Sequence, residues 1–238
     1  MTTTDASVAA VPLGEAVLDN PAYFALNGPQ AHLAERSGTA MRYPSDVSPF
    51  AALPLPATQQ NWADLRHLVD GRVGVSAGVH WDPPQDWRRH QPVDGVQLSG
   101  EGVVGRSDDE AIVLTTRDVP EMLALVERTR PGPFLPRTIE LGTYLGIRRG
   151  GELIAMAGER MKPPGWTEVS AVCTDERFRG QGLGSRLVLA VVANIRARGD
   201  RAFLHTGRQN VNAIRLYESL GFRLRRAAEF AAVQAPAR

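Results

Sequence analysis

The residues best suited to chemistry lie between 167 and 185, a segment that reads TEVSAVCTDERFRGQGLGS. An apolar run at 169–174 precedes a glycine-rich turn at 179–184 (RGQGLG), and a helical pattern follows at once. The first N–H groups of a helix have no partner within it, and the helix dipole adds partial positive charge there. Glycines let a phosphate approach such a backbone closely. The segment therefore predicts a site for a phosphorylated ligand, and a tight structural connection is the alternative.

Two known nucleotide-binding loops fit this turn poorly. A Walker A loop needs lysine after its last glycine, but Gly184 is followed by Ser185, and the one lysine of the chain, Lys162, lies upstream. A Rossmann loop needs G-x-G-x-x-G and an acidic residue after the next strand. This chain has G-x-G-x-G, and Asp200 precedes the apolar run at 203–206. Neither motif explains the turn.

A second motif lies downstream at 210–222 and reads NVNAIRLYESLGF. Its form, N-x-x-A-I-x-L-Y-x-x-x-G-F, taken with the earlier turn, closely resembles the GNAT superfamily of acyl-CoA-dependent N-acetyltransferases. The resemblance covers about residues 108–230 and is faint over the first hundred residues. It implies an α/β fold with a mixed, mostly antiparallel sheet flanked by helices, preceded by a smaller N-terminal α/β region, and acetyl-CoA as co-substrate.

The resemblance also assigns the residues that would hold coenzyme A. In GNAT proteins the central strand splays from its neighbour, and its freed backbone pairs with the pantetheine arm, here at Val172, Cys173 and Thr174. The backbone amides expected to hold the pyrophosphate are those of Arg179, Gly180, Gln181, Gly182, Leu183, Gly184 and Ser185. Glycines 182 and 184 should not tolerate bulk. Asn210 matches an asparagine that contacts the cofactor or caps the helix, and both roles stay open.

Catalytic roles follow from the same resemblance. Tyr217 matches the tyrosine proposed to protonate the CoA thiolate, and the alternative is a half-buried aromatic residue with a structural role. Glu168, at the start of the central strand, and Glu159, near the end of the preceding strand, are the candidate general bases. Glu140 in a nearby loop, or the lack of any single base, are the alternatives.

Other reactive residues are given structural roles. His205 is expected to be a packed core histidine. Cys173 lacks a visible histidine–acid partnership, and direct transfer needs no acyl-enzyme, so it is expected to be a small buried residue. His80 and His90 lack paired ligand spacing, so no metal is expected.

Composition restricts the class of protein. The chain has 238 residues, 43% hydrophobic and 22% charged, with a net charge of +1, which is ordinary for a soluble globular protein. Between 177 and 226 there are eleven arginines but two acids, which fits an anionic ligand or a solvated basic face. Without interleaved aromatic residues, nucleic acid is disfavoured. One cysteine, no signal-peptide pattern and no long apolar run predict a cytoplasmic protein with no membrane partner.

The chain is expected to have three parts: a disordered tail at 1–16, an accessory or degenerate GNAT-like domain at 17–106, and a GNAT domain at 107–238. The N-terminal part should contain a helix at 61–69 and strands at 72–76 and 93–98. Expected strands of the C-terminal part lie at 111–115, 143–148, 152–161, 169–174, 203–206 and 222–230. Its expected helices begin at 118, 183 and 213, with an irregular segment at 131–140 in place of the family's second helix.

These patterns lead to one functional hypothesis and one alternative. The protein is expected to transfer an acetyl group from acetyl-CoA to a primary amine of a small molecule or peptide. Acceptor residues are expected at 134–144 and 162–166, where Tyr144 and Trp166 form an aromatic wall or serve as packing residues. The alternative is a non-catalytic sensor of acyl-CoA with the same fold. The N-terminal part could dock a partner or form a homodimer.

Overall fold

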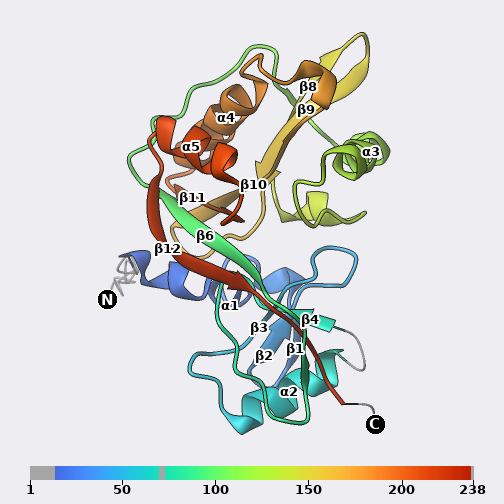
Figure 1. Ribbon diagram of the computed structural model, residues 1–238, viewed down its shortest axis with the longest axis vertical. Coiled ribbons are helices and arrows are strands. Elements are labelled where there is room, and N and C mark those ends of the chain that lie inside the picture. Colours follow the sequence, from blue (N-terminus) through green and yellow to red (C-terminus); the bar gives the residue numbers. More distant parts are fainter. Residues whose placement is uncertain (1–13, 70–72, 237–238) are drawn as a thin grey trace, which may run out of the picture.

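A computed structural model describes residues 14–69 and 73–236 (Figure 1). The large sheet and the helices that cover it form the upper part of Figure 1, and the two small sheets lie in the lower part. The long strand β12 (Arg223–Phe230) runs from the first part toward the second (Figure 1). Residues 1–13 of the tail expected at 1–16 lie outside the described residues. Its last three residues belong to a short 3-10 helix, η1 (Gly14–Asp19).

The central sheet has seven strands in the order β12-β6-β11-β10-β9-β8-β7. The strands are β6 (Val93–Gly100), β7 (Ile112–Val113), β8 (Tyr144–Arg149), β9 (Glu152–Glu159), β10 (Trp166–Thr174), β11 (Arg201–Gly207) and β12 (Arg223–Phe230). Every neighbouring pair is antiparallel except β10 and β11, which are parallel. The predicted mixed, mostly antiparallel sheet is therefore confirmed.

Helices cover both faces of this sheet. They are α3 (Val119–Thr129), α4 (Leu183–Ala197) and α5 (Val211–Ser219). Successive strand residues point to opposite faces, and β9 shows this clearly. Ala155 and Ala157 share a core with the apolar stripe of α4, whereas Met156 packs in a separate core with α3. The segment at 131–140, expected to be irregular in place of the family's second helix, has no α-helix, and a 3-10 turn, η4 (Thr138–Leu141), begins near its end.

Strand β6 lies before the boundary expected near 107, yet it belongs to the central sheet. It lies between β11 and β12, where Leu98 faces Leu204 on one side and Leu224 on the other. The first hundred residues thus supply an inner strand of the sheet. The sequence could not show this because an inner strand's partners, here β11 and β12, follow it by more than a hundred residues.

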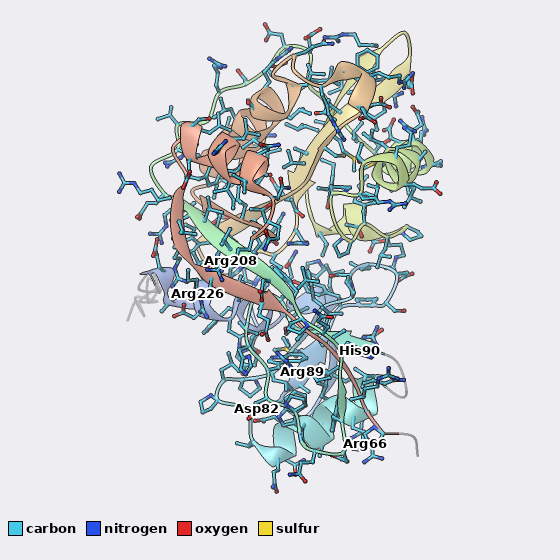
Figure 2. All side chains as sticks on the ribbon, viewed as in Figure 1. Arg66, Asp82, Arg89, His90, Arg208 and Arg226 are labelled. Atoms are coloured by element: carbon cyan, nitrogen blue, oxygen red, sulfur yellow. The ribbon has the colours of Figure 1, made fainter. Side chains whose placement is uncertain are left out.

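The N-terminal part holds two three-stranded sheets. Its elements are α1 (Pro21–Leu26), η2 (Ala31–Leu33), β1 (Glu35–Ser37), β2 (Ala40–Arg42), β3 (Ala51–Ala52), α2 (Gln59–Val69), β4 (Val73–Val75) and β5 (Arg88–Arg89). Strand β13 (Ala232–Gln234), from the C-terminal end of the chain, lies between β4 and β5. On β5, Arg89 (labelled in Figure 2) pairs with Glu229 of β12 at 2.6 Å. Backbone pairing through β13 and the ion pair between Arg89 and Glu229 therefore join the two parts.

Candidate functional site

The site begins where β10 leaves β11. Their parallel pairing runs from Trp166 opposite Arg201 to Val169 opposite Leu204 and stops there. On the other side of β10 the register with β9 shifts between Ser170 and Cys173. Within this bulge, Ala171 has a φ of 52°, a conformation that residues other than glycine rarely adopt. Strand β10 therefore bends away from β11, as the sequence analysis expected for the central strand.

A cleft of about 690 Å³ lies along this stretch of β10. Thr174, Arg179 and Asn210 line it near the glycine-rich turn. Phe50 and Gln91, both from the N-terminal part, also line it. Both parts of the chain thus build the same cleft.

The glycine-rich turn needs glycine for its backbone conformation. Gly180 has a φ of 79° and Gly182 one of 73°, and a Cβ at either position would meet no other heavy atom within 4 Å. Gly182 is the N-cap residue of α4, so the free N–H groups of that helix begin here. Gly184 differs, because a Cβ there would make only ordinary contacts of 3.9 Å to Thr174 Oγ1 and 4.0 Å to Val172 Cγ1. The turn requires its first two glycines, but Gly184 has room for alanine.

The expected coenzyme A residues fall into two groups. Val172, Cys173, Thr174, Arg179 and Asn210 line the cleft. Gly180, Gln181, Gly182, Leu183, Gly184 and Ser185 form the turn and the start of α4 next to it. Leu183 is buried in the core, so only its backbone is free to contribute. The Oδ1 atom of Asn210 accepts the N–H of Ala213 at 3.2 Å, so this residue caps α5 and borders the cleft.

Tyr217 of α5 lines the cleft with a side chain that is almost fully buried. Burial raises the pKa of Tyr217 to about 12, because an ionised phenolate would lose its hydration. The hydroxyl group therefore carries its proton throughout the neutral range and is available as a donor.

Glu168 is fully buried and already paired. Arg160 donates to it from Nε and from Nη2, each at 2.7 Å, and Nδ1 of His205 lies 2.7 Å from its Oε1 atom. Burial alone would raise the pKa of Glu168, but Arg160 and His205 outweigh burial and lower it to about 2. Glu168 does not line the cleft, whereas Arg160 and His205 do. The carboxylate therefore holds two cleft residues in place.

Glu159 is also fully buried outside the cleft. It pairs with Nη2 of Arg198 at 2.7 Å and with Nζ of Lys162 at 2.9 Å. The structure therefore brings Tyr217, but neither glutamate, to the cleft surface.

Cys173 and His205 occupy the positions expected of buried residues. Burial raises the pKa of the Cys173 thiol to about 11, which disfavours the nucleophilic thiolate. The His205 side chain is only 1% exposed. On its other edge, Nε2 lies 3.0 Å from Nε2 of Gln97 in β6.

The expected acceptor segments do not form the wall of the cleft. Trp166 is buried and donates its Nε1–H to the carbonyl of Gly14 at 3.0 Å, and Tyr144 is buried beneath α3. The packing role is therefore the one observed for both. Segment 129–133, just before the expected loop, lines the cleft instead.

Several cleft residues were missed by sequence reasoning. Phe50 and Gln91 carry no motif that could mark them. His205 had a weak signal, because Glu168 faces Phe203 in the parallel pair and side chains alternate along β11. That alternation places His205 on the same face of the sheet as Glu168.

Residues 14–69 and 73–236 lack two kinds of feature. No helix in that part of the chain is long and apolar enough to cross a membrane. Nor do these residues include a group of three or more His, Cys, Asp or Glu side chains that could hold a metal ion.

Comparison with known proteins gave consistent matches. A family model described as FR47-like protein matches residues 144–231. A crystal structure from Novosphingobium aromaticivorans, described as an acetyltransferase of the GNAT family, is 39% identical with a TM-score of 0.82, covering 93% of this chain and 99% of that one.

Two curated proteins match shorter segments. Mycothiol acetyltransferase of Thermobispora bispora is 50% identical over 56 residues, which are 23% of this chain and 19% of that protein. N-alpha-acetyltransferase RimI of Mycobacterium tuberculosis is 37% identical over 82 residues, which are 33% of this chain and 51% of that protein. The matched segment thus spans about a fifth of the first protein and about half of the second.

Proposed function

The chain belongs to the GNAT family of acetyltransferases, and from this premise we propose that it transfers an acetyl group from acetyl-CoA directly to a primary amine. One observation supports the proposal most: the cleft opens where β10 parts from β11, immediately before the glycine-rich turn of α4. Peptide groups of β10 and the N-terminal amides of α4 are there together, and they suit an extended amide-containing arm and a phosphate respectively.

In this proposal the protein's main contribution is positioning. Acetyl-CoA supplies an already activated acyl group as its thioester. The backbone of Val172, Cys173 and Thr174 aligns the pantetheine arm, and the amides of residues 179–185 hold the pyrophosphate. Arg179, whose side chain is 57% exposed at the cleft, adds positive charge. Holding both reactants in line converts a bimolecular step into an effectively unimolecular one.

Tyr217 acts as the general acid in the proposed reaction. As the C–S bond breaks, the hydroxyl group of Tyr217 gives its proton to the departing thiolate sulfur. The acceptor nitrogen forms the new C–N bond and releases its proton to water, and Tyr217 regains from water the proton that it gave. Glu168 acts as a positioning residue through Arg160 and His205, and Glu159 has a structural role in its pairs with Arg198 and Lys162.

The decisive experiment pairs ligand binding with turnover. Purified protein is heated with acetyl-CoA, with NAD and ATP as controls, and release of free CoA thiol is followed with a panel of amines. A ligand at 100 times its dissociation constant adds about 2.7 kcal/mol of stability. We expect selective stabilisation by acetyl-CoA, abolished in Gly182→Trp, and amine-dependent thiol release. Stabilisation without thiol release for any amine would instead indicate an acyl-CoA sensor.

A further inference from the structure

The cleft has a second end, away from the glycine-rich turn, that the cofactor roles leave unused. We propose that this end binds the acceptor, and that the acceptor is a small amine with a carboxylate and an apolar body, as in an apolar α-amino acid. This inference rests on the proposed acetyl transfer and adds the substrate class.

The guanidinium group that would recognise the carboxylate is that of Arg160. The N–H of Arg160 donates to the carbonyl of Glu168 at 3.0 Å, so its backbone lies beside the beginning of β10. The turn follows Thr174 at the far end of the same strand. At about 3.3 Å a residue, the backbone of Glu168 lies up to about 20 Å from Thr174. Arg160 therefore lies beside the end of β10 that is away from the turn.

Arg160 keeps one donor group free. Its Nε and Nη2 atoms are both taken by Glu168, and its guanidinium carbon lies 5.0 Å from the centre of the Phe50 ring. Within 14–69 and 73–236, Nη1 has no polar partner, yet Arg160 lines the cleft with a side chain 11% exposed. Two fixed bonds and a stacked ring hold the guanidinium plane, so Nη1 is a preorganised donor for a carboxylate oxygen.

The charge of the cleft excludes a second ammonium group on the acceptor. Among the described residues that line the cleft there is no aspartate or glutamate, but there are three arginines: Arg130, Arg160 and Arg179. The nearby carboxylate of Glu229 is paired with Arg89 at 2.6 Å, and His80 lies 3.1 Å from it. A second cation in the cleft would lose its hydration without gaining a counter-ion. Polyamines and the side chain of lysine therefore fit poorly.

Apolar side chains also line this end of the cleft. The rings of Phe50 and Phe230 lie 6.0 Å apart between centroids. The other apolar residues here are Val75, Val93 and Ala232. They come from β4, β6 and β13, so the N-terminal part and the C-terminal strand complete the acceptor site together. An uncharged hydrocarbon or aromatic side chain would be buried there favourably.

The test compares each amino acid with its own amide at saturating acetyl-CoA. L-leucine and L-phenylalanine are assayed by thiol release beside L-leucinamide and L-phenylalaninamide, with L-lysine and spermidine as cationic acceptors. We expect kcat/KM to be at least tenfold higher for the acids than for the amides. The amides are less basic amines and carry more free base at pH 8, so basicity works against this result.

Two variants separate a carboxylate site from a general effect on the fold. Val93 borders the cleft with 62% exposure, so Val93→Asp should leave folding intact, and Val93→Asn is its uncharged control. We expect Val93→Asp to raise KM for L-phenylalanine at least fivefold more than it raises KM for L-phenylalaninamide, and Val93→Asn to show no such difference between acid and amide. Arg160→Lys keeps the charge beside Glu168 but loses Nη1, and it should reduce the preference for acid over amide.

The outcomes distinguish this inference from the proposed function. Equal turnover of acids and amides, or preference for lysine or spermidine, would overturn the acceptor class and leave acetyl transfer standing. If acetyl-CoA stabilises the protein but none of these amines is acetylated, the proposed acceptor class is likewise overturned. Failure of acetyl-CoA to stabilise the folded protein would overturn the proposed function itself.

Discussion

The Nδ1 atom of His205 lies 2.7 Å from the Oε1 atom of Glu168, in a contact where both side chains are almost completely buried. The contact belongs to a row of polar groups that crosses the sheet. Glu168 binds Arg160 at the end of β9, and His205 contacts Gln97 of β6. Gln97 in turn accepts from Nη1 of Arg225 in β12 at 2.8 Å. The row fixes Arg160 at the cleft from several strands at once.

Acid should weaken this row. The folded-state pKa of Glu168 is depressed from 4.5 to about 2, so the unfolded chain binds the proton first as the pH falls. The stability that Glu168 contributes is fully present above pH 4.5 and is lost as the pH falls toward about 2. We expect the thermal midpoint to fall in this window, and less steeply in Glu168→Gln.

The same variant should be unstable at pH 7. Removing one partner of a buried pair leaves Arg160 uncompensated, which destabilises proteins by about 3–5 kcal/mol. Glu140→Gln is the matched control, because Glu140 pairs with Arg137 at the surface, where pairs contribute about 0–1 kcal/mol. Equal effects of the two variants in denaturant unfolding would contradict the buried row.

The glycines of the turn should differ in their response to alanine. Gly182→Ala forces a side chain into the left-handed region, at about 1–2 kcal/mol, whereas Gly184→Ala adds a Cβ that fits its surroundings and favours the helix. Thermal unfolding without ligand should show a lower midpoint for Gly182→Ala only. A similar loss in both would mean that Gly184 is constrained by something other than contacts to its Cβ.

Replacing Tyr217 by phenylalanine should separate catalysis from binding. Without the proton donor, kcat for acetyl transfer should fall by about 100-fold or more. Acetyl-CoA should still raise the thermal midpoint as before, because the turn and β10 are untouched. Tyr23→Phe, in helix α1, serves as the control. Unchanged turnover in Tyr217→Phe would assign the tyrosine a packing role.

Cys173→Ala should retain turnover within a few-fold. With its pKa raised to about 11, the Cys173 thiol is roughly 0.1% ionised at pH 8, so it is a poor nucleophile. We also expect slow alkylation of the native protein by iodoacetamide. Mass spectrometry of protein mixed with acetyl-CoA should find no acetyl group on Cys173. A trapped acetyl-cysteine would contradict direct transfer.

The sequence predicted those elements whose pattern of apolar residues and glycines lies within one short segment. Leu187 and Val191 repeat at helical spacing and form the buried face of α4, and Gly199 takes a left-handed conformation just after that helix. The bend of β10 away from β11 was expected at the position where it occurs, because the family resemblance covers that segment.

The acceptor end of the cleft could not be predicted in this way. Phe50 and Phe230 lie far apart in the chain and meet only through tertiary packing. The pairing of Glu168 was hidden for the same reason, since a carboxylate at a strand end looks equally suited to catalysis and to an ion pair. Its partners are Arg160, which directly follows β9, and His205 of β11, the strands on either side of β10.

The place of β6 between β11 and β12 has a consequence for the growing chain on the ribosome. Both partners of Val93–Gly100 lie beyond residue 200, so β6 emerges long before either can pair with it. Contacts that span so much sequence form slowly, because a long loop must close first. Until Arg223–Phe230 has been synthesised, β6 exposes at least one unpaired edge. We therefore expect nascent chains truncated before β12 to engage chaperones and to aggregate when released.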